Sequence, residues 1–151
     1  MCISRLIVSV FFLGFALLVS CSKDETSPTQ TDNFTKVFTA TIDGSAWDGS
    51  SDATVQKSGS TTTISGTAAN GQKINLELNG NLMSGFTTLG IHKGQIIEQS
   101  ANVWTSSIIS VTIDTVTATI LQGKFQFLAN PSSGSGTINK TVTEGKFSLK
   151  F

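Results

Sequence analysis

Apolar and polar side chains alternate in short runs along the chain, and this period of two constrains the fold more than any other feature. The clearest runs are Phe38–Ile42, Ile74–Leu78 and Ile109–Ile113, and the alternation returns in Phe125–Phe127 and Phe147–Phe151. Successive side chains of a β-strand point to opposite faces, so each run predicts a strand with one buried and one wet face. Such strands are typical of antiparallel sheets.

Turn residues separate the runs and predict where the chain reverses. Asp43-Gly44 ends the first run, and Ser58–Ser60 divides a strand expected near Ala53–Lys57 from one near Thr61–Ala68. Short turns of this kind connect neighbouring antiparallel strands. About eight or nine such strands between residues 34 and 151 predict an all-β domain, either an antiparallel β-sandwich or a partly open barrel.

Two Asn-Gly pairs and one polar stretch complete the predicted connections. Asn70-Gly71 and Asn79-Gly80 are expected to form hairpin turns, because a type I′ turn needs positive φ at both central residues. The stretch Asn130–Gly136, rich in Ser and Gly, is expected to be a flexible loop.

A glycine motif occurs twice at a spacing of 22 residues and predicts two irregular strands. Each copy has an apolar residue three positions before the glycine (Gly123 or Gly145) and Phe two positions after it. The apolar positions change from even to odd numbers at each glycine, so one extra residue must be accommodated. We expect a β-bulge or sharp bend at both, with the glycine adopting an unusual φ.

The first twenty residues have the pattern of a cleaved signal peptide. Met1–Arg5 carries one positive charge, and Leu6–Leu18 is an apolar run that spans about 20 Å as a helix, too short for a bilayer core of about 30 Å. Leu18-Val19-Ser20-Cys21 then resembles the bacterial lipobox. That resemblance implies cleavage before Cys21 and acylation of its thiol and amino group, which would hold the protein at a membrane.

The residues after Cys21 resemble a sorting signal. Ser22, Lys23, Asp24 and Glu25 are similar to the surface-export signal of Bacteroidota lipoproteins, which directs them to the outer leaflet of the outer membrane. Residues 22–33 contain no apolar side chain, so we expect residues 21–33 to be a flexible tether. The predicted organisation is a signal peptide (1–20), this tether and an all-β domain (34–151).

Composition argues against several functions. Ten basic and ten acidic residues give no charge excess for nucleic acid. His92 is the only histidine, and its neighbouring glycines predict a surface loop rather than a catalytic base. Asp43, Asp48 and Asp52 do not match the spacing of an EF-hand, so we interpret them as turn caps. We therefore expect no enzyme, no cofactor and no metal.

Three motifs carry a resemblance to a known family. They are Phe38–Gly44 followed by Trp47, the central Gly123-x-Phe125-x-Phe127, and the terminal Gly145-x-Phe147-x-Leu149. Together they resemble small uncharacterised Bacteroidota lipoproteins that are catalogued as domains of unknown function. The resemblance implies a β fold and a lipid anchor, and it supplies no catalytic residue.

The two tryptophans, Trp47 and Trp104, are the candidate ligand-binding residues. Each is either an exposed platform on which a sugar stacks or a half-buried plug at the end of the fold. We expect a lipid-anchored outer-membrane module at the cell surface that recognises a glycan, a peptide or a neighbouring envelope protein. The alternative is a barrel-type carrier of a small apolar ligand, which would need an interior cavity above about 300 Å³.

Overall fold

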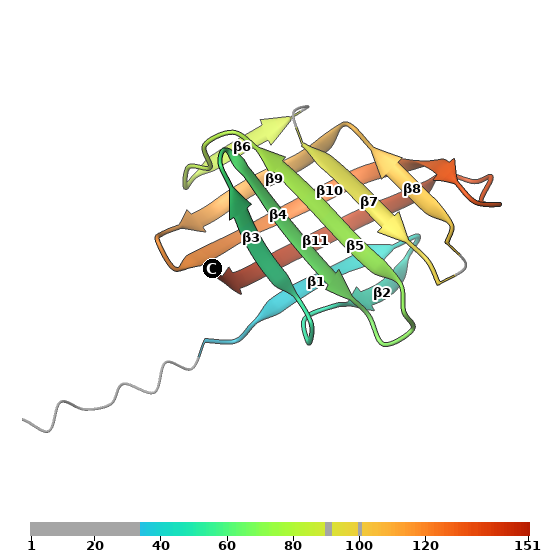
Figure 1. The fold of residues 1–151 in the computed structure, drawn as a ribbon, viewed down its shortest axis with the longest axis horizontal. Coiled ribbons are helices and arrows are strands. Elements are labelled where there is room, and N and C mark those ends of the chain that lie inside the picture. The colour runs from blue at the N-terminus through green and yellow to red at the C-terminus, as the bar shows by residue number, and fades with distance from the viewer. Residues whose placement is uncertain (1–33, 90–91, 100) are drawn as a thin grey trace, which may run out of the picture. The chain divides into compact units, whose positions relative to one another are not determined.

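The structure describes residues 34–89, 92–99 and 101–151. These residues form eleven antiparallel strands and the turns and loops that connect them (Figure 1). In this computed structural model no helix among those residues is long and apolar enough to cross a membrane. The all-β prediction is confirmed. The leader, Cys21 and the Ser22–Glu25 segment lie outside the described residues.

The strands follow the apolar runs of the sequence and extend most of them. They are β1 (Val37–Ile42), β2 (Ser45–Asp48), β3 (Thr54–Ser58), β4 (Thr61–Thr67), β5 (Lys73–Asn79), β6 (Phe86–Leu89), β7 (Lys93–Ile97), β8 (Val103–Ser106), β9 (Ile109–Val116), β10 (Ile120–Ser133) and β11 (Lys140–Lys150).

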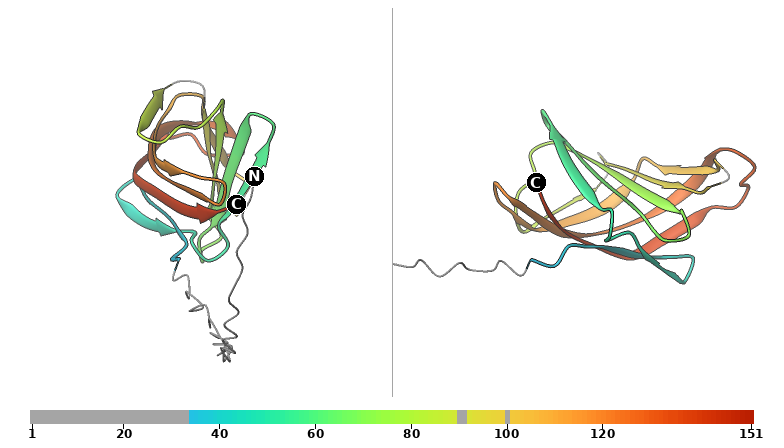
Figure 2. Two further views of the ribbon diagram at one scale, coloured as in Figure 1. Left: turned by 90° about the vertical axis from the view of Figure 1, so that its left-hand side faces the viewer. Right: turned by 60° about the horizontal axis from the view of Figure 1, so that its bottom comes forward.

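Nine strands form one continuous path in the order β2-β1-β11-β10-β8-β7-β5-β4-β3. A branch of two more strands, β9 and β6, leaves the path at β10. The sheet curls so that β3, β4, β5 and β7 cross over the layer that contains β1, β9, β10 and β11 (Figures 1 and 2). The result is a curled half-barrel, which corresponds to the partly open barrel, one of the two architectures that the sequence left open.

The long strand β10 makes the curl possible because it belongs to both layers. Its residues 120–129 pair with β11, and residues 121–127 also pair with β9. Beyond them, Asn130, Pro131 and Ser133 pair with β8. The predicted loop at Asn130–Gly136 is therefore wrong in its first half. Pro131 is tolerated because it lies where the register with β8 shifts, so its missing N–H interrupts an already irregular ladder.

Phenylalanine rings fill the space between the layers. Phe125 lies 5.7 Å from Phe38 and 6.3 Å from both Phe127 and Phe147, measured between ring centroids. Gly94 of β7 lies directly against the Phe127 ring, where an added Cβ would approach a ring carbon to 2.8 Å. Close approach of the backbone to a ring is one use of glycine within a strand. The interior is thus occupied by side chains.

Most predicted turns are confirmed in position, and one is wrong. Asp43 and Gly44 both have positive φ and join β1 to β2. Asn70-Gly71 lies in the hairpin between β4 and β5 as predicted, but only Gly71 has positive φ, so the type I′ turn expected there is wrong. Gly59 also has positive φ and lies in the turn that connects β3 to β4. The hairpin expected at Asn79-Gly80 does not form, because β5 pairs with β4 and β7 while the next strand, β6, pairs with β9.

A β-bulge lies beside Gly145, as the hydrophobic pattern predicts. Val142 and Gly145 are both buried, and the two residues between them, Thr143 and Glu144, face a single residue of β10. The positive φ, 53°, belongs to Glu144, so its assignment to the glycine is wrong. Gly145 is required for space, because an added Cβ would lie 2.5 Å from the carbonyl oxygen of Phe125.

The irregularity at Gly123 has a different origin from the predicted one. The register with β9 shifts there, but the extra residue is Asp114 of β9. Burial runs through β10 without a change of parity, because Leu121 is buried and Ile120, which suggested the change, is only partly buried. Gly123 has no positive φ and leaves room for the carbonyl oxygen of Thr112, which an added Cβ would approach to 2.3 Å.

Candidate functional site

Both candidate tryptophans are core residues. Trp47 is 3% exposed and Trp104 is 4% exposed. The indole N–H of Trp47 donates to the carbonyl oxygen of Gln72 at 2.9 Å, and that of Trp104 donates to the carbonyl oxygen of Ile138 at 2.8 Å. A ring that is buried and already satisfied offers no open face to a sugar. The interpretation as sugar platforms is therefore wrong, and both side chains plug the fold.

His92 is buried, contrary to the surface position that its glycine neighbours suggest. Its side chain is 1% exposed. The backbone N–H of Asn79 donates to Nδ1 at 3.0 Å, and Nε2 contacts Oγ1 of Thr88. Because Nδ1 accepts, the ring proton belongs on Nε2 and the imidazole is neutral. Burial lowers the pKa of His92 below its ordinary value, which favours the same neutral form.

The three aspartates of the first loops bind three different backbone N–H groups. Asp43 accepts from Thr141 at 2.8 Å. Asp48 accepts from Ser50 at 2.8 Å, and its pKa is lowered by side-chain and backbone hydrogen bonds to Ser50. Asp48 is therefore the predicted turn cap, whereas Asp43 binds a strand 98 residues away, so its interpretation as a turn cap is wrong. Across residues 34–89, 92–99 and 101–151, no three His, Cys, Asp or Glu side chains gather into a cluster that could hold a metal.

Asp52 is the third of these aspartates and links two separate segments. It accepts from the backbone N–H of Thr67 at 2.6 Å, and this hydrogen bond is the main cause of its lowered pKa. Asp52 thereby ties the loop after β2 to the end of β4.

The candidate site is a polar hollow on the outer face of β4, β5 and β7. It has a volume of about 350 Å³. The strands place hydroxyl, amide and charged groups side by side there, because their inward-facing neighbours are the apolar residues of the core. The lining side chains are those of Thr63, Ser65, Lys73, Asn75, Glu77, Lys93 and Gln95. We call this surface the polar hollow.

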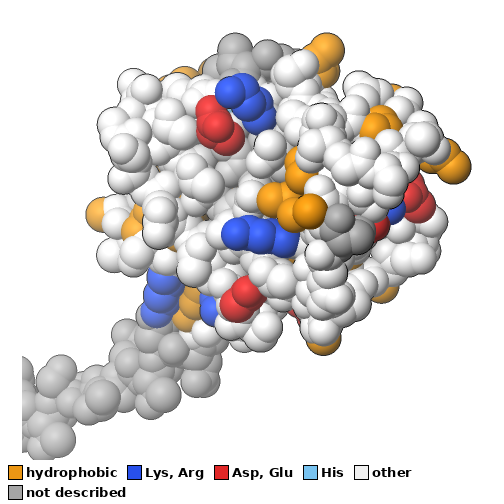
Figure 3. Space-filling model, turned by 45° about the vertical axis from the view of Figure 1, so that its right-hand side comes forward, with side chains coloured by type: hydrophobic (Ala, Val, Ile, Leu, Met, Phe, Trp, Pro, Cys, Tyr) orange, Lys and Arg blue, Asp and Glu red, His pale blue; other side chains and the backbone are white. Residues whose placement is uncertain are grey.

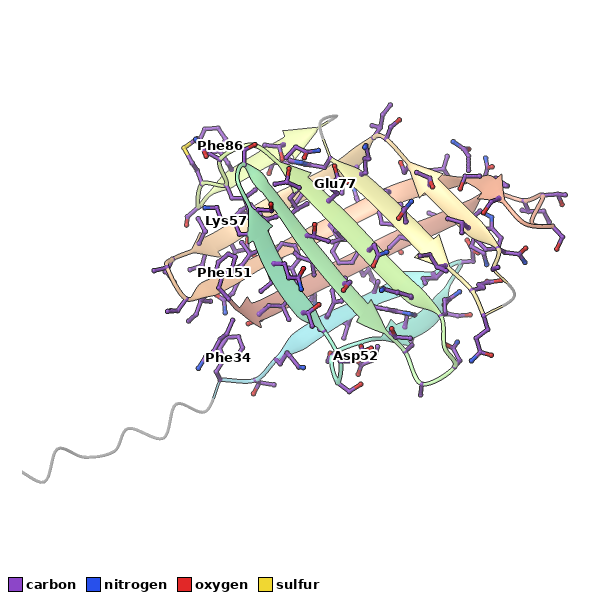
Figure 4. The ribbon with its side chains drawn as sticks, viewed as in Figure 1. Phe34, Asp52, Lys57, Glu77, Phe86 and Phe151 are labelled. Carbon is purple, nitrogen blue, oxygen red and sulfur yellow. The ribbon has the colours of Figure 1, made fainter. Side chains whose placement is uncertain are left out.

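Asn75 lies at the centre of the polar hollow. It pairs with Ser65 of β4 on one side and with Gln95 of β7 on the other. Its side-chain oxygen is buried and accepts no hydrogen bond within the described part of the chain. Beside it, Lys93 Nζ lies 3.7 Å from a carboxylate oxygen of Glu77, which is labelled in Figure 4. The hollow therefore combines an unused acceptor with an exposed ion pair.

A second, larger hollow of about 600 Å³ lies over β1, β2 and β11. Within it the hydroxyl of Thr41 donates to Oε2 of Glu144 at 3.0 Å. The polar hollow on β5 is the stronger candidate because the buried side-chain oxygen of Asn75 has no hydrogen-bond donor among the described residues. Both hollows open to solvent, and the face turned forward in Figure 3 consists mostly of uncharged polar side chains and backbone.

The sequence did not single out the residues of the polar hollow. The alternation correctly assigns Asn75 and Glu77 to the wet face of their strand, but every strand has such a face. What distinguishes this hollow is the side-chain oxygen of Asn75 that lacks a hydrogen-bond donor. This feature becomes visible only when β4, β5 and β7 are assembled. No family model, no curated protein and no solved structure matches this chain.

Proposed function

We propose that this chain is a lipid-anchored, non-enzymatic recognition module of the outer membrane, displayed at the cell surface, and that its polar hollow binds a polar ligand such as a glycan. The lipobox at Leu18–Cys21 and the residues Ser22–Glu25 support the anchor and the address. The relationship to small Bacteroidota lipoproteins, carried by the glycine and phenylalanine motifs, is part of the same proposal.

The observation that carries the binding proposal is the unpartnered side-chain oxygen of Asn75. A buried acceptor without a hydrogen bond costs about 1–3 kcal/mol, and a ligand hydroxyl or amide that donates to it recovers that free energy. Neighbouring Thr, Ser and Gln side chains offer both donors and acceptors, which suits the dense hydroxyl groups of a sugar.

The arrangement of His92 supports a non-enzymatic role. Both ring nitrogens are engaged in contacts that hold β6, β7 and the end of β5 together. A general base needs a nitrogen that can take a proton from a substrate within hydrogen-bond reach. The carrier alternative gains no support from the side-chain-filled interior.

Glycan-array screening of the full chain, followed by calorimetry, tests the binding proposal. Replacing Asn75→Ala removes the acceptor and should weaken binding of any captured glycan by about 10-fold, corresponding to one hydrogen bond of about 1.4 kcal/mol. Thr39→Ala, in the other hollow, is the matched control and should leave affinity unchanged. Binding that survives Asn75→Ala at full strength contradicts the site, and capture of a peptide or envelope protein instead would change the ligand class.

Membrane fractionation tests the anchor separately. Cys21→Ala removes the acylated thiol and should move the protein out of the membrane fraction, because no acyl chain then inserts into the bilayer. Unchanged fractionation would contradict the anchor while leaving the polar hollow untouched.

A further inference from the structure

We propose that one end of the domain rests on the surface of a bilayer with anionic headgroups. This end, which we call the Phe34 end, carries Phe34, Lys57, Met83, Phe86 and Phe151. Four of these side chains, Phe34, Lys57, Phe86 and Phe151, are spread across the same end of the horizontal axis in Figure 4. The inference rests on the lipid anchor of the proposed function and adds an orientation and a second membrane contact.

The position of Phe34 is fixed by a contact with the last strand. Lys150 Nζ of β11 lies 4.9 Å from the centroid of the Phe34 ring. A cation over an aromatic ring at this distance is attractive. The covalent path from Cys21 therefore joins the domain at the Phe34 end.

Chain length favours this end over the opposite one. The thirteen residues from Cys21 to Phe34 span at most about 45 Å when fully extended. Strand β10, with its 14 residues, is about 46 Å long and runs from the Phe34 end toward the loop that carries Ile138 (Figure 1). If the Ile138 loop faced the bilayer, the connecting residues would have to be almost fully extended. If the Phe34 end faces it, they need no such extension.

The chemistry of the Phe34 end matches a membrane surface. Phe86 is 54% exposed and Met83, in the loop just before it, is 52% exposed. Exposed Phe side chains can insert at the boundary between headgroups and acyl chains, and lysines near an anionic leaflet are attracted to it. Lys57 is exposed on the edge strand β3. At the other end Lys140 is already paired, because its Nζ lies 2.9 Å from a carboxylate oxygen of Glu98.

Fluorescence of a single added tryptophan tests the orientation. The processed, lipidated chain is reconstituted into vesicles of phosphatidylglycerol and phosphatidylcholine in equal parts, with and without bromine on the acyl chains. Phe86→Trp places a reporter at the Phe34 end. Ile138→Trp places a matched reporter at the opposite end, where Ile138 is 79% exposed. The wild-type chain, whose two tryptophans are buried, supplies the baseline.

The expected result is a blue shift and several-fold stronger bromine quenching for Phe86→Trp than for Ile138→Trp. Adding Lys57→Glu to the first reporter should reduce its quenching, whereas Lys73→Glu, which removes the same charge at the start of β5, should not. Equal quenching at both reporters, or stronger quenching at Ile138→Trp, overturns the orientation. Intact mass of the same sample separates the two proposals: an unmodified Cys21 overturns the anchor and the orientation together, whereas a lipidated chain with equal quenching overturns only the orientation.

Discussion

Trp47 on β2 and Trp104 on β8 are buried to the same extent by different means. Each donates its indole N–H to a backbone carbonyl oxygen of a distant segment, at 2.9 Å and 2.8 Å. Each also has a glycine against its ring, Gly49 for Trp47 and Gly136 for Trp104, where an added Cβ would approach a ring carbon to 2.4 Å. The two tryptophans therefore have the same two features, each with its own partners: a hydrogen bond from the indole N–H and a glycine against the ring.

The cover over each ring differs. Trp47 meets the edge of Phe38 at a centroid distance of 5.1 Å, inside the apolar core. Trp104 is covered by Lys140, whose Nζ lies 4.5 Å from the ring centroid and also pairs with Glu98. A large indole can therefore be buried by apolar packing or by a cation held in place by an acid. The second arrangement depends on charge and solvent, and the first does not.

Removing each tryptophan gives the largest expected effect. Trp47→Ala should lower the free energy of unfolding by about 4–5 kcal/mol, and Trp104→Ala by about 3 kcal/mol, because truncating a buried aromatic costs about 3–5 kcal/mol and the lysine side of Trp104 can admit water. Urea denaturation followed by circular dichroism measures both. The reverse order would contradict the comparison, and Trp→Phe at each site is the control that keeps an aromatic ring.

Filling the space beneath each ring should separate the two plugs further. Gly49→Ala should destabilise by about 2–3 kcal/mol, because the new Cβ meets the Trp47 ring and also lies 3.1 Å from the backbone of Gly66. Gly136→Ala should cost only about 1 kcal/mol, because its nearest contacts all belong to the Trp104 ring and its loop can shift. Equal losses in thermal or urea denaturation would indicate that both glycines are held with the same rigidity.

Acidification tests the contribution of His92 to the free energy of unfolding. This contribution is independent of both tryptophans, because indole side chains do not titrate. The pKa of His92 is lower in the folded state than its unfolded value near 6.5, so the unfolded chain binds the proton first. Its contribution to stability is complete above that pH and declines as the pH falls below it, by at most about 1.4 kcal/mol per pH unit. Urea denaturation between pH 8 and pH 5 should show this decline.

His92→Gln provides the control for the pH dependence. The variant should be less stable at neutral pH, because the contacts of the buried imidazole with Asn79 and Thr88 are lost. Its stability should also change less between pH 7 and pH 5 than that of the wild-type chain. A variant whose pH profile parallels the wild type would assign the decline to other groups.

Lys140→Met is the smallest expected change and the most specific to the Trp104 plug. Loss of the cation over the ring and of the ion pair with Glu98 should cost about 0.5–1 kcal/mol. The salt dependence of stability should weaken, since the ion pairs of Lys140 with Glu98 and with Asp43 are both removed from screening. Lys124→Met on the outer face of β10 is the matched control and should leave that dependence unchanged. If Lys140→Met were as destabilising as Trp104→Ala, Lys140 would have to stabilise other parts of the fold besides Trp104.

The fold was largely predictable because local alternation decides which side of a strand is buried. The runs around Phe38, Ile74 and Ile109 became strands with the expected inward faces. The bulge beside Gly145 was also predictable, because an apolar pattern that changes parity within one strand requires an extra residue. These features depend on residues close together in the sequence.

The errors concern residues whose environment is made by distant segments. Asn79-Gly80 has the composition of a hairpin turn, yet β7 and not β6 binds the free side of β5. His92 is buried by contacts with Asn79 and Thr88 that no local pattern announces. Asn75 is a candidate site residue only because its neighbours on β4 and β7 leave its side-chain oxygen without a donor.

The pairing of β1 with β11 has a consequence for how the protein is made. Thr41 and Glu144, which are hydrogen-bonded across these strands, are 103 residues apart in the chain. During synthesis β1 must therefore wait, with one edge uncovered, until β11, the last of the described strands, has been made. A polypeptide interrupted before residue 140 would keep that edge open, and uncovered edges invite other chains to add to them. Completion of synthesis is thus a condition for avoiding aggregation.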